Sequence, residues 1–107
     1  MKHHTYHVYI LLCSDGSYYT GVTNDIDRRF EEHQNGSDPY CYTYSRRPLV
    51  LKFSEPYQFV DDAIGREKQI KGWSRRKKEA LISSNYEKLK TLSMNRVRRE
   101  EKERSGA

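Results

Sequence analysis

The sequence predicts an α+β domain, in which a small antiparallel sheet of three strands is flanked by helices in the order β-β-α-β-α-α. Two apolar and aromatic runs, at residues 5–13 and 18–23, are separated by the hairpin turn signal Ser14-Asp15-Gly16-Ser17. Further along the chain, polar capping residues precede apolar residues at helical spacing. The 107 residues suffice for one domain, and nine Tyr, three Phe and one Trp supply bulky core material.

The first half of the chain supplies a hairpin and a helix. Thr5–Cys13 and Tyr18–Thr23 are expected as its two strands, because both are rich in β-branched and aromatic residues. Asn24 is expected to cap a helix that runs to about Gln34, and Gly36 is a suitable stop.

The middle of the chain supplies a loop, a strand and a second helix. A polar and aromatic loop spans residues 37–47. The third strand is expected at Leu49–Phe53, closed by Pro56. The second helix is expected from about Phe59 to Lys71.

The last third of the chain changes character. Gly72-Trp73-Ser74 interrupts the helical pattern, and Ser74 can cap a third helix from Arg75 to about Ser83. Residues 86–92 are consistent with a further short helix, and the almost wholly charged residues 96–107 are expected to be flexible. We therefore expect a folded domain over residues 1–85, followed by a short helix and charged tail over residues 86–107.

The positive charge lies in one part of the chain. Of the net charge of +5, residues 1–54 contribute nothing, with six Lys or Arg against six Asp or Glu. Between residues 66 and 78, seven basic side chains face one acid, which is typical of a surface that binds a polyanion such as nucleic acid. A solvated helix face is the alternative. The seven are Arg66, Lys68, Lys71, Arg75, Arg76, Lys77 and Lys78.

Several classes of protein are excluded. No run approaches the roughly 18 apolar residues that a membrane span needs, so no membrane partner is expected. Cys13 and Cys41 form no Cys-x-x-Cys pair and no disulfide framework. We expect reduced thiols in a cytoplasmic protein, with Cys13 buried.

Two polar residues fall on the apolar face of the first expected helix. Ile26, Phe30 and His33 share that face at spacings of four and three, and Arg29 also lies on it. The ordinary explanation for Arg29 is that its side chain extends along the sheet edge. The ordinary explanation for His33 is a histidine with satisfied hydrogen bonds. A functional role for both is the alternative.

The second expected helix has a carboxylate in a similar position. Glu67 lies at the centre of a stripe formed by Val60, Ala63 and Ile64. Because a half-buried carboxylate is costly unless paired, it is either an ion-pair partner of Arg29 or a nearby lysine, or a metal ligand. A single carboxylate suits Mg²⁺ better than Zn²⁺, since Mg²⁺ keeps its waters and shares phosphate oxygens.

The chain resembles the GIY-YIG nuclease domain over roughly residues 5–85. His7-Val8-Tyr9 and Tyr19-Thr20-Gly21 stand where that family has Gly-Ile-Tyr and Tyr-Ile-Gly, and the two tyrosines are ten residues apart. Residues 24–33 resemble its first helix, with an Arg four residues before a His, and residues 66–73 resemble the helix that carries its metal-binding Glu. The chain most resembles the small stand-alone bacterial members, relatives of the N-terminal domain of UvrC. Asn85 is a loose match to an Asn near the end of the family's domain.

The resemblance implies a Mg²⁺-dependent endonuclease that hydrolyses DNA phosphodiester bonds in repair, recombination or processing, with Mn²⁺ as a possible substitute. Tyr9 would take a proton from water, alone or with His33, and Tyr19 would orient the water or the phosphate. Because the ordinary pKa of tyrosine is about 10, the metal or Arg29 would have to lower it. Arg29 would neutralise charge on the phosphate, and Glu67 would hold the metal.

Two other functions remain open from the sequence. A non-catalytic module that binds nucleic acid would keep the fold, the basic residues and tyrosines for stacking. A domain that binds an unknown protein partner, with an incidental basic surface, is the third possibility. Retention of Tyr9, Tyr19, Arg29 and Glu67 together favours catalysis, because a binding module needs no such combination.

Overall fold

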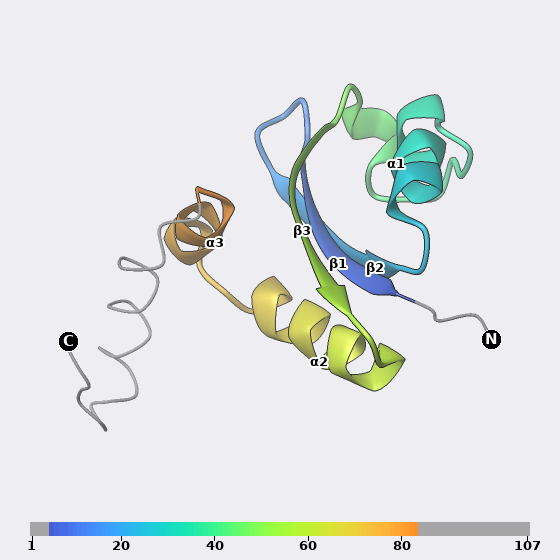
Figure 1. Cartoon of the computed structure of the whole chain (residues 1–107). Helices are drawn as coiled ribbons and strands as arrows, with labels where there is room; N and C mark the ends of the chain where they lie inside the picture. Colours follow the sequence, from blue (N-terminus) through green and yellow to red (C-terminus); the bar gives the residue numbers. More distant parts are fainter. Residues whose placement is uncertain (1–4, 84–107) are drawn as a thin grey trace. The chain divides into compact units, whose positions relative to one another are not determined.

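The computed structural model describes residues 5–83 and has the expected α+β architecture (Figure 1). Residues 5–72 form one compact unit, and a second unit begins at Trp73. Four expectations lie outside the described residues. They are the role of Asn85, the domain boundary at residue 85, the helix at 86–92 and the charged tail. The elements are β1 (Tyr6–Leu12), β2 (Tyr18–Thr23), α1 (Ile26–Asn35), β3 (Val50–Tyr57), α2 (Val60–Lys71) and α3 (Arg75–Ile82), with one 3₁₀ turn at Tyr44–Arg46.

The hairpin between β1 and β2 closes on a glycine and an aspartate. Gly16 has a φ of 86°, a conformation in which a side chain would be strained, and its N–H donates to the Cys13 carbonyl at 2.9 Å. The Asp15 carboxylate accepts hydrogen bonds from both the backbone N–H and the hydroxyl of Ser17. The turn thereby determines the register of the two strands.

The sheet is antiparallel with the order β2-β1-β3, so β1 is its central strand. Val8, Tyr9, Ile10 and Leu11 are all buried, which means that both faces of β1 are covered. On β2, Gly21 pairs with Tyr9 and Tyr19 pairs with Leu11. The side chains of Tyr9 and Tyr19 therefore lie on the same face of the sheet.

Strand β3 is longer than the sequence predicts, because it continues through Pro56 to Tyr57. Pro56 pairs with His7 at the edge of the sheet. A proline lacks the N–H that a central strand needs, but an edge strand leaves every second N–H unpaired and accommodates it. The expectation that Pro56 closes the strand is therefore wrong.

Helix α1 begins one residue later than expected. Its N-cap is Asp25 rather than Asn24, and the Asp25 carboxylate accepts a hydrogen bond from the Arg28 N–H at 3.1 Å. Gly36 ends the helix in the left-handed conformation, as predicted. Ile26 and Phe30 pack against the cluster that contains Tyr9 and Leu11.

Helix α2 contacts all three strands and buries Ala63 and Ile70. Val60, which the sequence places on the apolar stripe, is 40% exposed because it is the first residue of the helix. In the second unit, the Ser74 hydroxyl caps α3 as predicted by accepting from the Lys77 N–H. Across residues 5–83, no helix combines the length and the apolar character that crossing a membrane requires.

Candidate active site

The candidate site is organised around a buried contact between Tyr9 and His33. Tyr9 comes from the middle of β1 and His33 from the last turn of α1, and they are 1% and 4% exposed. The Tyr9 hydroxyl lies 2.9 Å from Nε2 of His33. The ring of Tyr9 reaches this position across Gly21, where a side chain would collide with it.

Burial keeps both groups neutral. It raises the pKa of Tyr9 to about 12, with a further contribution from neighbouring Tyr19, and nearby Arg29 offsets only part of this effect. Burial and the positive charge of Arg29 lower the pKa of His33 to about 4. At neutral pH the site therefore holds a neutral phenol beside a neutral imidazole, and Arg29 does not bring the pKa of Tyr9 below its usual value.

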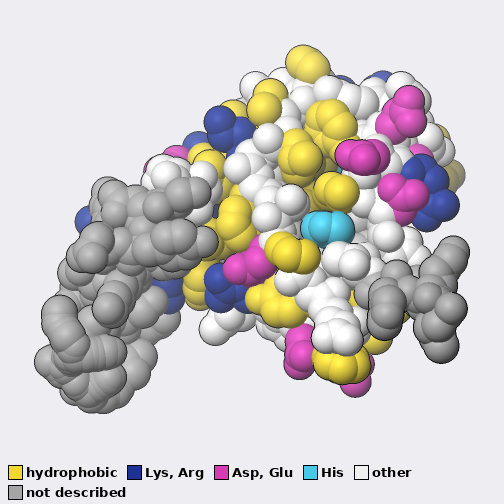
Figure 2. Space-filling model, viewed as in Figure 1, with side chains coloured by type: hydrophobic (Ala, Val, Ile, Leu, Met, Phe, Trp, Pro, Cys, Tyr) yellow, Lys and Arg dark blue, Asp and Glu magenta, His cyan; other side chains and the backbone are white. Residues whose placement is uncertain are grey.

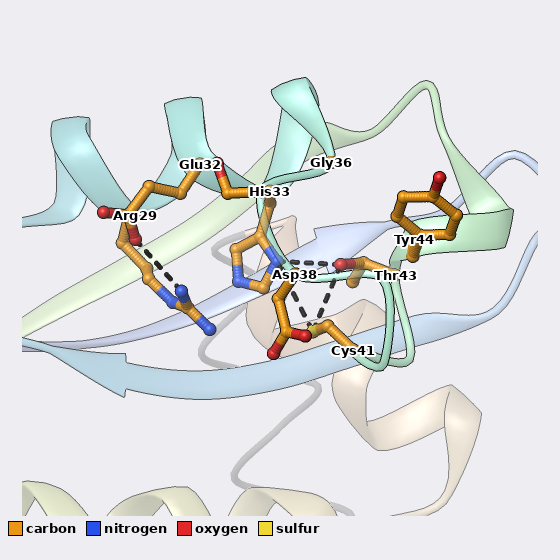
Figure 3. A pocket seen from close by; sticks show the side chains of 9 residues that line it. Arg29, Glu32, His33, Gly36, Asp38, Cys41, Thr43 and Tyr44 are labelled. Atoms are coloured by element: carbon orange, nitrogen blue, oxygen red, sulfur yellow. Dashed lines mark hydrogen bonds and ion pairs between the residues drawn. The ribbon is translucent and has the colours of Figure 1, made fainter.

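The other ring nitrogen of His33 faces the loop between α1 and β3. Its Nδ1 lies 2.8 Å from Oγ1 of Thr43, which is 1% exposed, and 3.9 Å from Sγ of Cys41 (Figure 3). The Thr43 hydroxyl donates to Sγ of Cys41 at 3.4 Å. The imidazole is thus held from both sides, by a strand and by a loop.

Tyr19 lies beside this pair. Its ring centroid is 6.3 Å from that of Tyr9 and 5.2 Å from that of His33. Tyr42 stacks on Tyr19 at 6.0 Å with an interplanar angle of 19°, and the guanidinium of Arg46 lies 3.7 Å above the Tyr42 ring. The loop therefore supports Tyr19 as well as His33.

Arg29 provides the positive charge of the group. Its guanidinium donates to Glu32 at 3.0 Å, and its side chain is 34% exposed. Burial opposes this charge, but the bond with Glu32 and the interaction with Tyr9 outweigh it and raise the pKa of Arg29. Arg29, Glu32, His33, Cys41 and Thr43 line a small open hollow beside the loop, as Figure 3 shows.

Glu67 connects to this group through a lysine. Its side chain is 13% exposed, and its carboxylate lies 2.6 Å from Nζ of Lys71. This bond with Glu67 is the main cause of the raised pKa of Lys71, to which the electrostatic interaction with Tyr19 also contributes. The carboxylate therefore has the ion-pair partner that its position demands, a lysine rather than Arg29.

The donor set at Glu67 fits a hard divalent ion. Within residues 5–83, no group of three or more His, Cys, Asp or Glu side chains is arranged to hold a metal. A single carboxylate suits Mg²⁺, which keeps several waters and binds phosphate oxygens of a substrate. It does not suit Zn²⁺, which takes three or four protein ligands.

The seven basic residues differ in their surroundings. Lys68, Lys71, Arg75 and Arg76 are exposed. Arg66 donates from Nε to Glu55 at 2.9 Å, and Lys77 is 6% exposed with its ammonium 4.3 Å from the centre of the Trp73 ring. Burial and neighbouring Arg75 lower the pKa of Lys78. Four of the seven side chains are thus accessible to solvent.

The surface is mixed in character. Hydrophobic side chains, which include tyrosine in this colouring, occupy much of the face shown in Figure 2, with acidic and basic groups beside them. Tyr40 is 96% exposed. Sequence reasoning missed Cys41, Tyr42 and Thr43, because the loop has no periodicity that distinguishes a buried polar residue from an exposed one. It also missed Glu32 on α1, whose role depends on its contact with Arg29.

The fold and the tyrosine motifs together define a class of protein. The model of the GIY-YIG catalytic domain matches residues 5–80, and the chain belongs to this family. The family suggests nuclease activity, DNA binding and dependence on a divalent metal.

Particular relatives are small proteins of the same kind. A UPF0213 protein of Halobacterium salinarum is 47% identical over 72% of this chain and 99% of its own length. One from Staphylococcus saprophyticus is 44% identical over 73% of this chain and 94% of its own. The solution NMR structure of a protein from E. faecalis is similar with a TM-score of 0.53, at 32% identity over 80% of this chain and 88% of that one.

Proposed function

We propose that this protein is a Mg²⁺-dependent endonuclease that hydrolyses DNA phosphodiester bonds in repair, recombination or processing. The observation that carries the proposal is the 2.9 Å contact between the Tyr9 hydroxyl and Nε2 of His33, with Arg29 and Tyr19 beside it. A buried phenol bonded to a neutral imidazole can accept a proton on one side and release one on the other.

The substrate phosphate meets Arg29 first. The Arg29 side chain is 34% exposed, far more than Tyr9 or His33, and it holds Glu32 in the free protein. A phosphate offers it the same charge-assisted hydrogen bonds, and exchange of Glu32 for phosphate opens the approach to Tyr9 beneath. Arg29 then neutralises the charge that develops on the phosphate oxygens during attack.

Proton transfer runs through Tyr9 to His33. The oxygen of the attacking water forms a bond to phosphorus, its proton passes to the Tyr9 oxygen, and the Tyr9 proton passes to Nε2 of His33. The bond to the leaving oxygen breaks, and that oxygen takes a proton from solvent. His33, whose pKa is about 4, then releases its proton to solvent, so that the site returns to its starting state. Because no tyrosinate forms, a pKa of about 12 for Tyr9 does not block this route.

Glu67 would hold the metal, with Lys71 giving up its bond to the carboxylate. When bound, Mg²⁺ supplies Lewis-acid polarisation of the phosphate. Tyr19, supported by Tyr42, orients the water or the phosphate from the side of β2. Exposed Lys68, Arg75 and Arg76 add affinity for the DNA backbone without reading its sequence.

The test is a cleavage assay with purified protein. Branched, flapped, single-stranded and duplex DNA are incubated with Mg²⁺, with Mn²⁺ and with chelator. Metal-dependent cleavage of at least one form is expected. If no form is cleaved with either metal while the protein binds DNA, the function is that of a nucleic-acid-binding module.

Glu67→Ala separates metal binding from folding. We expect it to abolish cleavage while keeping the fold and most DNA affinity, because it removes the metal's ligand but no positive charge. Glu79→Ala is the matched control, since Glu79 also pairs with a basic residue four positions away on a helix. If Glu67→Ala unfolds the protein and the control does not, Glu67 is a structural ion-pair partner.

A further inference from the structure

The loop residue Thr43 makes a contact that the proposed chemistry does not itself require. Its hydroxyl is 1% exposed and lies 2.8 Å from Nδ1 of His33, on the side of the ring opposite Tyr9. A buried hydroxyl bonded to a buried imidazole limits which nitrogen carries the hydrogen. The direction of each bond around the ring follows from the donors and acceptors available.

The Tyr9 hydroxyl can donate in one direction. The Tyr9 side chain is buried, and neighbouring Arg29 offers it no acceptor, because a guanidinium has only donors. The hydrogen of Tyr9 therefore goes to Nε2 of His33, which must carry a lone pair. A neutral imidazole then has its hydrogen on Nδ1.

The loop side of the ring is consistent with this direction. The Thr43 hydroxyl donates its one hydrogen to Sγ of Cys41, at 3.4 Å. Its oxygen is left to accept from Nδ1 of His33. The bonds thus point the same way, from Tyr9 through His33 and Thr43 to Cys41. Sγ of Cys41 also lies 3.9 Å from Nδ1 of His33, as a second and weaker acceptor.

We propose that Thr43 is a positioning residue that holds His33 in the Nδ1–H form, so that its Nε2 lone pair faces the Tyr9 hydroxyl. The inference rests on the proposed function for its consequence in cleavage, but the tautomer is a property of the protein alone. The opposite tautomer would turn Nε2 into a donor, and His33 could then take no proton from Tyr9.

The first test is the tautomer itself, measured on the full chain. Long-range ¹⁵N–¹H correlation spectra at pH 7 distinguish a protonated from a bare ring nitrogen. In the unmodified protein we expect hydrogen on Nδ1 and none on Nε2 of His33. Hydrogen on Nε2 overturns the proposal without any variant, and whether or not the protein cleaves DNA.

Substitutions at Thr43 test what holds the tautomer. Thr43→Val keeps the shape but loses the acceptor, so we expect the population to shift toward hydrogen on Nε2, while Thr43→Ser restores the Nδ1–H form. Thr20→Val is the matched control, because Thr20 is also buried but its hydroxyl has no hydrogen-bond partner among residues 5–83. An unchanged tautomer in Thr43→Val overturns the proposal. If Thr43→Val does not fold, Thr43→Ser provides the test instead: loss of the Nδ1–H form in Thr43→Ser overturns the proposal.

Cleavage kinetics connect the tautomer to the reaction. Thr43→Val is expected to lower kcat about 10- to 100-fold with little change in KM, as for groups that orient a working histidine. Thr43→Ser should recover most of this loss. The tautomer can shift as expected while neither the unmodified protein nor any variant cuts DNA. In that case the proposed function fails, and the positioning role of Thr43 stands.

Discussion

Gly21 leaves the space that the ring of Tyr9 occupies. A Cβ at Gly21 would lie 2.6 Å from Cζ of Tyr9, closer than any real contact, and Tyr9 is the residue that pairs with Gly21 across the two strands. Among residues 5–83, Tyr9 is also the largest of the fully buried side chains, so its ring is closely surrounded. The absence of a side chain at Gly21 thus determines where the Tyr9 hydroxyl lies.

Gly21→Ala should therefore displace Tyr9 from His33. We expect a loss of stability of about 1–3 kcal/mol from overpacking, with loss of the proposed cleavage. Gly65→Ala is the control, since Gly65 lies in α2 with open space around it, and there alanine should stabilise by about 0.5–1 kcal/mol. Urea unfolding checks both values, and equal stability of the two variants would contradict the steric explanation.

The His33 imidazole should resist protonation. With a folded pKa of about 4 against an ordinary value of 6.5, the unfolded chain binds a proton between these pH values that the folded protein excludes. The free energy of unfolding should fall as the pH is lowered from 6.5 to 4 and then level off. The full difference corresponds to on the order of 3 kcal/mol.

His33→Gln tests this pH dependence. The unmodified protein should be more stable than the variant at pH 7, and that advantage should shrink as the pH approaches 4. An NMR titration of the His33 ring measures the pKa directly. A midpoint near 6.5 would show that the imidazole is protonated as easily in the folded protein as in water.

Tyr9→Phe should separate the chemistry of the site from its packing. The ring remains, but Nε2 of buried His33 loses its donor, at a cost of about 1–3 kcal/mol. If Tyr9 relays the proton, kcat should fall at least roughly 100-fold. Tyr40→Phe is the control. Because Tyr40 is 96% exposed, this substitution should leave both stability and rate unchanged. Full activity in Tyr9→Phe would remove the phenol from the mechanism.

The basic residues of α3 should act on affinity alone. Arg76→Glu, alone and together with Arg75→Glu, should weaken binding to all duplex sequences about equally. Each lost phosphate contact should reduce the slope of log affinity against log salt by about 0.9. Lys52→Glu makes the same single change in charge at an exposed position of β3 and should have the smaller effect. A strong preference among duplex sequences would contradict a role limited to the DNA backbone.

The elements of the fold could be predicted because their signals are local. A run of β-branched and aromatic residues marked β1, the turn at Gly16 aligned β2, and Gly36 ended α1. The errors also have local causes: Asn24 and Asp25 are both good caps, and Pro56 stops a strand only in the interior of a sheet. Which residue caps the helix, and whether a strand lies at the edge of a sheet, depend on spatial neighbours that the sequence alone does not locate.

For the candidate site, the sequence alone determined which side chains share a helix face. Helix periodicity placed Arg29 with His33, because periodicity depends only on residue spacing. Tyr9 and Tyr19 lie on different strands, so they share a face only through the register that the turn sets. The tertiary structure decided the partners: Lys71 for Glu67, Glu32 for Arg29, and Thr43 for His33. It also decided that burial raises the pKa of Tyr9. Hydrogen bonds and desolvation act over a few ångströms in space, and loop residues such as Thr43 reach their partners only when the chain has folded.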